Sequence, residues 1–290
     1  MPRKKVVETM WGWRNILFFI CLPLLLGMVL SSFVPRPLIG TLTINNPIDD
    51  YKMQFALEQL RYAETHSEIR AVLLILDCPG GTISGTELIY LELMHLRQTK
   101  PVVTMIEGLS ASGAYYLTVA TDYAIANPSA LVGNVGVLGE IPSKPRVFEE
   151  TYSTGPYKLW GFPQDEWVRQ MDMMKTTFLQ AVLNGRGNSL KITPERILRG
   201  EVYPASEALR LGLIDEIGPL SAAIEKTADL AHIDHYQVVD LWGRLEGNQA
   251  DKDKSASGFY AVDENGKSTN HPKEPGFYYL YVPDAEGWQP

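Results

Sequence analysis

The sequence predicts an α/β protein that is attached to a membrane by an N-terminal transmembrane helix. Strand-like apolar runs alternate with helix-like segments along most of the chain, which is the order of α/β folds with right-handed crossovers. Residues 16–34 carry no charged side chain. The chain has 290 residues, of which 45% are hydrophobic and 21% charged. This composition is that of an ordinary globular protein, and the length allows a sizeable core.

The uncharged segment 16–34, ILFFICLPLLLGMVLSSFV, is the predicted transmembrane anchor. At about 1.5 Å per residue it spans roughly 28 Å, close to a bilayer core of about 30 Å. Four basic residues precede it and only Arg36 follows closely, so the positive-inside rule places residues 1–15 in the cytoplasm and the rest outside. The alternative is a cleaved signal peptide with Ser31 and Ser32 near the cut. A retained, single-pass anchor in the cell membrane is favoured because the apolar run is longer than a usual signal sequence.

The folded domain is expected over residues 37–242. The run AVLLILD (71–77) is continuously apolar, which is typical of a strand that is buried on both faces of a parallel sheet. Further strands are expected at 37–48, 102–106, 123–128 and 236–242, and helices at 50–65, 87–98, 165–184, 193–199 and 219–232, with a helix against a short strand in 201–218. Residues 243–290 form a polar, Gly/Pro-containing C-terminal tail, in which FYYLYVP (277–283) is aromatic enough to dock as a strand.

The net charge and the two cysteines argue against several classes of function. The net charge of −8 gives no basic surface for nucleic acid. Cys21 lies in the apolar span and Cys78 beyond it, on opposite sides of a membrane interface, so a disulfide between them is excluded. No CxxC or Cys/His cluster is present, and neither a metal nor a cofactor is expected.

Two glycine-rich turns follow two of the expected strands. They are DCPGGTISG (77–85) and EGLSASGA (107–114), and in an open α/β sheet both should meet at the carboxyl edge of the strands. Their backbone N–H groups could donate the hydrogen bonds of an oxyanion hole. Ser112 lies in the second turn, between an apolar strand and a helix-like stretch. It is either a helix N-cap or a nucleophile held on a sharp turn.

A serine nucleophile needs a base, and none of the five histidines falls in a segment expected to cover these turns. Lys158 lies in STGPYKLWG (153–161) among aromatic and apolar residues, where burial would favour its neutral form. The alternative is a lysine whose stem merely covers apolar surface. Lys144, in IPSKPR, is the second candidate base.

The order of these motifs resembles the signal peptide peptidase A/protease IV family. The matching segments are the PGG turn, SASGAYY, NPSALVGNVGV (127–137), TGPYK (154–158) and GEVYPASEALRLGLIDEIG (200–218), and the resemblance covers roughly residues 37–235. It implies a ClpP/crotonase-like fold of repeated ββα units, with a serine/lysine dyad of Ser112 and Lys158. Gly80, Gly81 and Gly113 correspond to the oxyanion hole, and the family assembles into dome-like homo-oligomers in which neighbouring subunits complete each dyad of the short forms.

Two motifs depart from the family pattern. Asp77 and Cys78 replace Asn and Ser before the PGG turn, and Asn134 replaces the serine that helps to hold the lysine. The Asn134 carbonyl oxygen could accept a hydrogen bond from the lysine amine. These departures leave open a catalytically weak or inactive pseudopeptidase that acts as a membrane scaffold. A crotonase-type acyl-CoA enzyme is a further alternative, although no paired catalytic carboxylates accompany the second turn.

The expected substrates are short, largely apolar peptides near the bilayer, namely cleaved signal peptides and misfolded exported segments. This expectation rests partly on the resemblance and partly on the anchor, which keeps the site close to the membrane. The expected neighbours of the scissile bond favour small or apolar side chains there. They are Leu109, Tyr115, Leu131, Val132 and Leu138.

Overall fold

The computed structural model describes residues 17–32, 36–139, 154–155, 157–158, 161, 163–246, 260–262, 268–272 and 277–280. The chain divides into two compact units, Met1–Pro37 and Leu38–Pro290. In the first, a π-helix η1 (Leu17–Cys21) leads into helix α2 (Leu22–Ser32). In the described residues, no helix combines the length and apolarity needed to cross a membrane. The anchor predicted over 16–34 is therefore unsupported, and its residues 16, 33 and 34, like segment 1–15, lie outside the described residues.

The second unit is built on an eight-stranded sheet with the strand order β10-β1-β2-β4-β5-β9, to which β6 and β8 add beside β4. All neighbours along the main path are parallel, which confirms the α/β prediction. Its strands are β1 (Leu38–Ile44), β2 (Ile69–Cys78), β4 (Val102–Ala111), β5 (Tyr123–Ala126), β6 (Leu131–Gly133), β8 (Val202–Pro204), β9 (Glu216–Ile217) and β10 (Gln237–Asp240).

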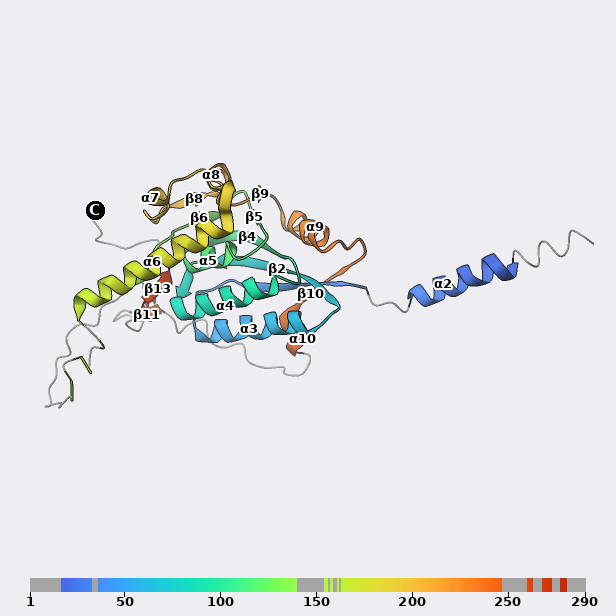
Figure 1. Cartoon of the computed structure of the whole chain (residues 1–290), viewed down its shortest axis with the longest axis horizontal. Helices are drawn as coiled ribbons and strands as arrows, with labels where there is room; N and C mark the ends of the chain where they lie inside the picture. The colour runs from blue at the N-terminus through green and yellow to red at the C-terminus, as the bar shows by residue number, and fades with distance from the viewer. Residues whose placement is uncertain are drawn as a thin grey trace, which may run out of the picture. The chain divides into compact units, whose positions relative to one another are not determined.

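Helices connect these strands in the expected order (Figure 1). They are α3 (Asp50–Thr65), α4 (Ile83–Leu96), α5 (Gly113–Thr118), α6 (Gln164–Arg186), the 3₁₀ helix η2 (Gly187–Ser189), α7 (Pro194–Ile197), α8 (Ala205–Leu211), α9 (Leu220–Ala231) and α10 (Leu241–Glu246). Helix α4 begins earlier than predicted because the Thr82 hydroxyl caps it by accepting from the Gly85 N–H at 3.3 Å.

Strand β2 is buried on both faces, as its apolar run predicts. Val72, Leu74 and Leu76 belong to the core beneath α3 and α4, whereas Leu73 faces the core beneath α9. Successive side chains of a strand point to opposite faces, so a strand covered on both sides needs apolar residues at every position. This packing holds the carboxyl ends of β2 and β4 side by side.

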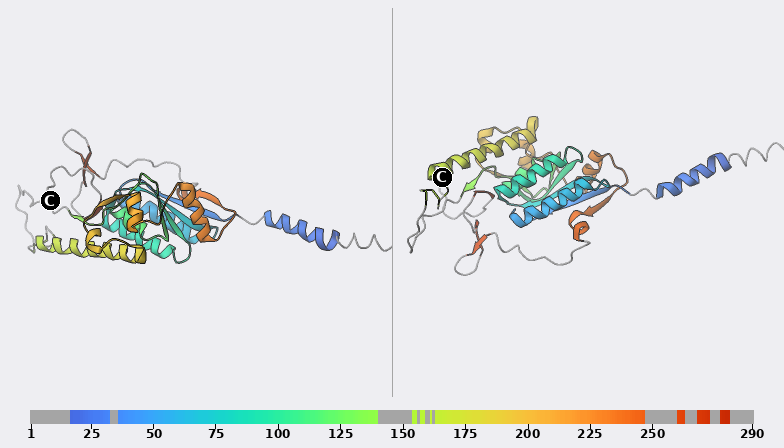
Figure 2. Two further views of the ribbon diagram at one scale, coloured as in Figure 1. Left: turned by 90° about the horizontal axis from the view of Figure 1, so that it is seen from above. Right: turned by 60° about the horizontal axis from the view of Figure 1, so that its bottom comes forward.

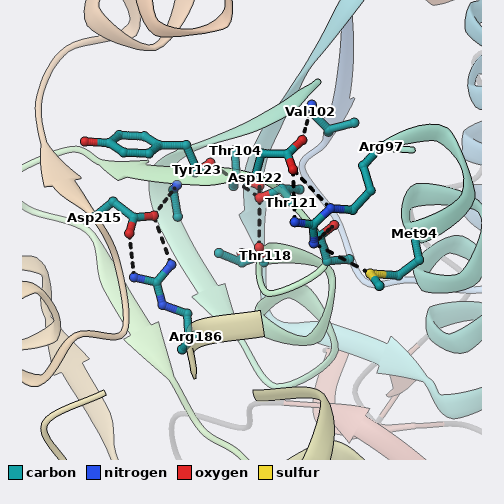
Figure 3. Close-up of polar contacts among 12 residues, drawn as sticks. Met94, Arg97, Val102, Thr104, Thr118, Thr121, Asp122, Tyr123, Arg186 and Asp215 are labelled. Atoms are coloured by element: carbon teal, nitrogen blue, oxygen red, sulfur yellow. Dashed lines mark hydrogen bonds and ion pairs between the residues drawn. The ribbon is translucent and has the colours of Figure 1, made fainter. Parts of the chain in front are cut away.

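Two Arg–Asp pairs tie helices to the loops at the sheet edge (Figure 3). Arg186, at the end of α6, pairs with both oxygens of Asp215 at 2.7 and 2.9 Å, and its side chain is buried. Arg97 binds a single oxygen of Asp122 through two nitrogens, at 2.9 and 3.1 Å, and the other oxygen accepts from the Val102 N–H at 2.9 Å. The bidentate Arg186–Asp215 pair fixes orientation as well as position.

Helix α6 packs on the core mainly along its C-terminal half. Its buried residues begin at Phe178, and Val168 and Met173 on the N-terminal half are exposed. In both figures this half projects beyond the sheet (Figures 1 and 2). The turn that carries Lys158 lies just before α6 in the sequence.

Part of the predicted tail returns to the domain. Strand β13 (Phe277–Leu280) lies between β3 (Gly80–Thr82) and β7 (Leu138–Gly139) in a three-stranded antiparallel sheet, which confirms a docking strand in this aromatic segment. Strands β11 (Tyr260–Val262) and β12 (Ser268–Pro272) form a separate pair.

Candidate active site

Ser112 occupies the junction between strand β4 and helix α5. Its backbone has φ 54° and ψ −119°, a conformation that non-glycine residues rarely adopt. The Ser112 N–H donates to the Gly133 carbonyl at 2.8 Å, and the Ser112 carbonyl accepts from the Tyr116 N–H at 3.0 Å. The side chain occupies the N-cap position but makes no capping hydrogen bond. The geometry is that of a strained strand-to-helix turn, and Ser112 is buried in it rather than exposed as the sequence suggests. The capping role is not the one observed.

The PGG turn is shaped by close backbone packing. Gly80 has φ +101°, and a β-carbon on Gly81 would lie 2.1 Å from the Ile48 carbonyl oxygen. Only glycine fits both positions. The Gly80 carbonyl and the Thr82 N–H bond to the Ile48 backbone, each at 2.8 Å. Because strand groups alternate in direction, the Gly81 N–H and carbonyl point to the other edge, where β13 lies.

The two glycine turns meet, as the topology predicts. A β-carbon on Gly80 would lie 2.6 Å from the Gly113 nitrogen, and one on Gly113 would lie 3.2 Å from the Gly80 α-carbon. Gly113 is the first residue of α5, so its N–H has no acceptor within the helix. The Gly80 N–H, in contrast, donates to the Cys78 sulfur at 3.4 Å. The N–H groups of Gly81 and Gly113 are therefore better placed as oxyanion donors than that of Gly80.

Asn134 lies beside the serine. It follows Gly133, whose carbonyl receives the Ser112 N–H, and it has φ 56°. The Asn134 side-chain amide donates to the Gly200 carbonyl at 2.9 Å, and its backbone N–H donates to the Glu201 carbonyl at 2.8 Å. These bonds hold the Asn134 side chain in place next to the Ser112 turn.

Lys158 is not brought to the serine within this single chain. It lies exposed on a turn that contains two hydrogen bonds, from the Lys158 N–H to the Gly155 carbonyl at 3.2 Å and from the Gly161 N–H to the Tyr157 carbonyl at 2.6 Å. Among the described residues, neither Ser112 nor Asn134 bonds to its amine. The expected burial of the amine is wrong for the isolated chain, because α6 contacts the core only well beyond this turn. Lys144 lies outside the described residues.

Cys78 is a structural residue of the PGG turn. Its buried thiol donates to the Asn46 carbonyl at 3.0 Å. Burial raises the pKa of the Cys78 thiol to about 12, so the group stays protonated at neutral pH and is a poor nucleophile. Asp77 next to it is exposed.

Sequence reasoning missed several residues at the site. The Thr86 hydroxyl is fully buried and is, within the described part of the chain, the one buried side-chain polar atom without a hydrogen-bond partner. A β-carbon on Gly113 would lie 2.7 Å from it. Tyr116, rather than the expected Tyr115, faces the docked strand, where its ring stacks on Tyr279. Tyr115 is instead fixed in the core by its hydrogen bond to the Leu213 carbonyl at 3.0 Å.

Comparisons with known proteins connect this geometry with peptidases. The profile of peptidase family S49 matches residues 94–234, and that of Clp protease matches residues 39–132. A Methanocaldococcus jannaschii protein that is named provisionally as a protease is 29% identical over 61% of this chain and 61% of its own length. Protease 4 of Salmonella typhi is 31% identical over 62% of this chain, and the chloroplastic serine protease SPPA of Arabidopsis thaliana is 27% identical over 64%.

A solved enoyl-CoA hydratase/isomerase family structure from Silicibacter pomeroyi aligns with 67% of this chain and 77% of its own chain, at 21% identity and a TM-score of 0.45. The chain spans only about a third of the length of the Salmonella and Arabidopsis relatives, with 32% and 29% covered. The Clp protease match and the mixed α/β sheet agree with a ClpP/crotonase-like fold. These matches confirm the resemblance to peptidase family S49 and to the proteins named Protease 4 and SPPA, the signal peptide peptidase A/protease IV family.

Proposed function

We propose that the chain is a serine peptidase in which Ser112 is the nucleophile and Lys158 the general base. The observation that carries the proposal is the backbone of Ser112, with its positive φ, its uncapped side chain and its position beside the two glycine turns. A strained conformation of this kind persists only where surrounding structure enforces it, and such positions cluster at active sites.

In the proposed reaction, the Ser112 hydroxyl oxygen attacks the peptide carbonyl while its proton passes to the neutral Lys158 amine. The N–H groups of Gly81 and Gly113 stabilise the negative oxygen that forms. The C–N bond then breaks, the amine leaves with the proton from Lys158, and Ser112 is acylated. Water activated by the same lysine cleaves the ester and regenerates the hydroxyl.

The lysine is supplied by a neighbouring copy in a homo-oligomer. Support comes from the exposed position of Lys158 and from the exposed N-terminal half of α6, where Val168 is 60% and Met173 57% exposed. Large apolar side chains gathered on a projecting helix are typical of association surfaces. Asn134, fixed beside Ser112, would offer its carbonyl oxygen to the incoming amine.

The N-terminal segment anchors the domain to the cell membrane, with the catalytic unit on the extracytoplasmic side. The described side chains of η1 and α2 are apolar and exposed; they include Phe18, Phe19, Ile20, Leu22, Leu24, Leu25 and Leu26. The substrates are then peptides that collect near the bilayer, such as cleaved signal peptides and misfolded exported segments. Protease digestion of intact spheroplasts tests the topology, which a protected catalytic domain would contradict.

Labelling with a fluorophosphonate probe tests the nucleophile. The wild-type chain should label once, at Ser112, and Ser112→Ala should not label while keeping its circular dichroism spectrum. Ser110→Ala is the matched control, because Ser110 is a buried serine of the same strand whose hydroxyl bonds to Thr118 at 2.8 Å. Labelling should persist in this variant.

A second candidate function, a pseudopeptidase scaffold, is favoured by the separation of Lys158 from Ser112 in the single chain. If the protein is such a scaffold, the assembled wild-type protein should neither react with the probe nor hydrolyse peptides. Labelling of the Ser112→Ala variant would reject Ser112 as the nucleophile altogether.

A further inference from the structure

Strand β13 occupies the position that an extended peptide would take at this site. It pairs antiparallel with β3 on one side, with Tyr279 opposite Gly81, and with β7 on the other, with Phe277 opposite Gly139. Adding a strand to an exposed sheet edge is a general way of binding peptides, in which the backbone supplies affinity and the side chains supply selectivity. The chain's own residues 277–280 therefore show how a peptide fits between β3 and β7.

The Tyr279 carbonyl marks the reacting position along this strand. A β-carbon on Gly80 would lie 1.9 Å from the Tyr279 carbonyl oxygen, and one on Gly113 would lie 3.0 Å from it. This oxygen thus lies where the two glycine turns meet, next to the residue that follows Ser112. In a peptide bound in the same register, the residue at the Tyr279 position would contribute the carbonyl beside the scissile bond.

The Tyr279 ring fills a site made of aromatic side chains. It is fully buried, stacks on Tyr116 with ring centroids 5.3 Å apart, and meets Phe178 edge-on at 4.9 Å. Its hydroxyl donates to the Met174 carbonyl at 3.1 Å. We call Tyr116, Phe178 and the Met174 carbonyl the aromatic site.

The aromatic site has the chemistry to select tyrosine. Stacked and edge-on rings contribute about 0.5–1.5 kcal/mol per pair beyond the area that they bury. The Met174 carbonyl accepts an additional hydrogen bond from the tyrosine hydroxyl, which phenylalanine cannot donate. A small residue such as alanine would fill neither feature, in contrast to the small side chains expected from the sequence.

We propose that this peptidase selects substrates with a tyrosine, and next best a phenylalanine, immediately before the scissile bond, through the aromatic site that Tyr279 fills in the free chain. The proposed selectivity in cleavage rests on the proposed peptidase function. The recognition itself depends only on β3, β7 and the aromatic site. One consequence is that the chain's own Tyr279 competes with incoming peptides.

Peptide binding tests the recognition without catalysis. The full chain carrying Ser112→Ala and Tyr279→Ala cannot turn over substrate and leaves the aromatic site empty. Fluorescein-labelled PGFYYL, the sequence of residues 275–280, should bind about tenfold or more tightly than PGFYAL in fluorescence anisotropy, with PGFYFL in between. Equal affinities for PGFYYL and PGFYAL would overturn the proposal.

Matched variants show that the preference comes from the aromatic site. The chain with Ser112→Ala and Tyr278→Ala loses a tyrosine from the opposite face of β13 but keeps Tyr279, so it should bind PGFYYL more weakly than the Tyr279→Ala chain. Adding Phe178→Leu to the Tyr279→Ala chain should reduce the preference for PGFYYL. If Tyr279→Ala lowers the folded fraction by circular dichroism, Tyr279→Leu replaces it.

Hydrolysis by the wild-type chain separates this proposal from the proposed function. Peptides that differ only before the cut should rank Tyr, Phe, Leu and Ala in kcat/KM. Hydrolysis without this ranking would overturn the selectivity and leave the peptidase intact. A binding preference for PGFYYL in a chain that neither labels nor hydrolyses would support the recognition and refute the peptidase.

Discussion

Ser112 is fixed by backbone hydrogen bonds on both sides, whereas Lys158 lies exposed on a turn. The serine N–H donates to Gly133 of β6, its carbonyl accepts from Tyr116 of α5, and α5 is buried in the core. The lysine precedes a helix whose first half has no buried residue. One chain thus fixes the proposed nucleophile and leaves the proposed base unpaired with it, which is the arrangement expected if assembly, rather than folding, completes the site.

Substitution of Lys158 should give the largest change in activity. Lys158→Ala should lower kcat/KM by about 10²–10⁴-fold, the usual contribution of a general base. Lys158→Arg should be no better, because arginine does not become neutral in proteins. Lys175→Ala is the control, since Lys175 is another lysine of the exposed region and pairs only with Asp172 on the same helix. Substantial activity in Lys158→Arg would move the base to another residue, with Lys144 next.

Mixing two inactive variants sharpens the same point. Copies with Ser112→Ala retain Lys158, and copies with Lys158→Ala retain Ser112. If neighbouring copies share the dyad, a mixed assembly should regain part of the activity. A mixture that stays inactive while its copies exchange would place both residues of each dyad in one chain.

The buried end of α6 should be far more sensitive than its exposed end. Asp215→Asn removes the partner of buried Arg186 and should lower the free energy of unfolding by about 3 kcal/mol in urea titrations. Asp172→Asn breaks the exposed pair with Lys175 and should cost about 0.5 kcal/mol or less. Equal losses would show that α6 is not anchored at Arg186.

The contrast also shows how far the sequence reaches. The apolar run of β2 and the two glycine turns follow local rules, and these rules predicted a buried parallel strand and turns that meet at one edge. Strand β4 was expected to end at Ile106, yet it continues to Ala111 because residues 109–111 pair with β6. Pairing with a distant strand overrides local propensity, and no local pattern reveals it.

The parts of the site that were missed depend on partners far along the chain. Nothing in the AYY run distinguishes Tyr115, which bonds to Leu213, from Tyr116, which faces Tyr279. The Lys158 segment was expected to be buried because its residues are apolar and aromatic. Such a segment can be buried by its own chain or by another copy, and composition alone does not separate the two cases.

The buried Cys78 thiol should make the free energy of unfolding depend on pH. Burial raises its pKa from 9.0 to about 12, so the folded chain keeps a proton that the unfolded chain loses. The stabilisation is complete below pH 9 and is lost as the pH rises toward 12. Between pH 8 and 10, the free energy of unfolding of the wild type should fall by about 1 kcal/mol more than that of Cys78→Ala. Parallel pH profiles would show that the thiol is not buried.

Thr86→Val should change stability and activity by small amounts and in opposite directions. Its buried hydroxyl has no partner among the described residues and lies against Gly113, so Thr86→Val removes an unsatisfied group and should stabilise the fold by about 1 kcal/mol. We expect kcat/KM to fall by about two- to tenfold, because the hydroxyl lies against Gly113, whose N–H is a proposed oxyanion donor. Thr104→Val is the control: Thr104 is equally buried but paired with Thr121 at 2.9 Å, so this variant should lose stability and keep its activity. Stabilised Thr86→Val with unchanged kcat/KM would make the hydroxyl a packing residue and confine the reacting groups to the serine, the glycine turns and the lysine.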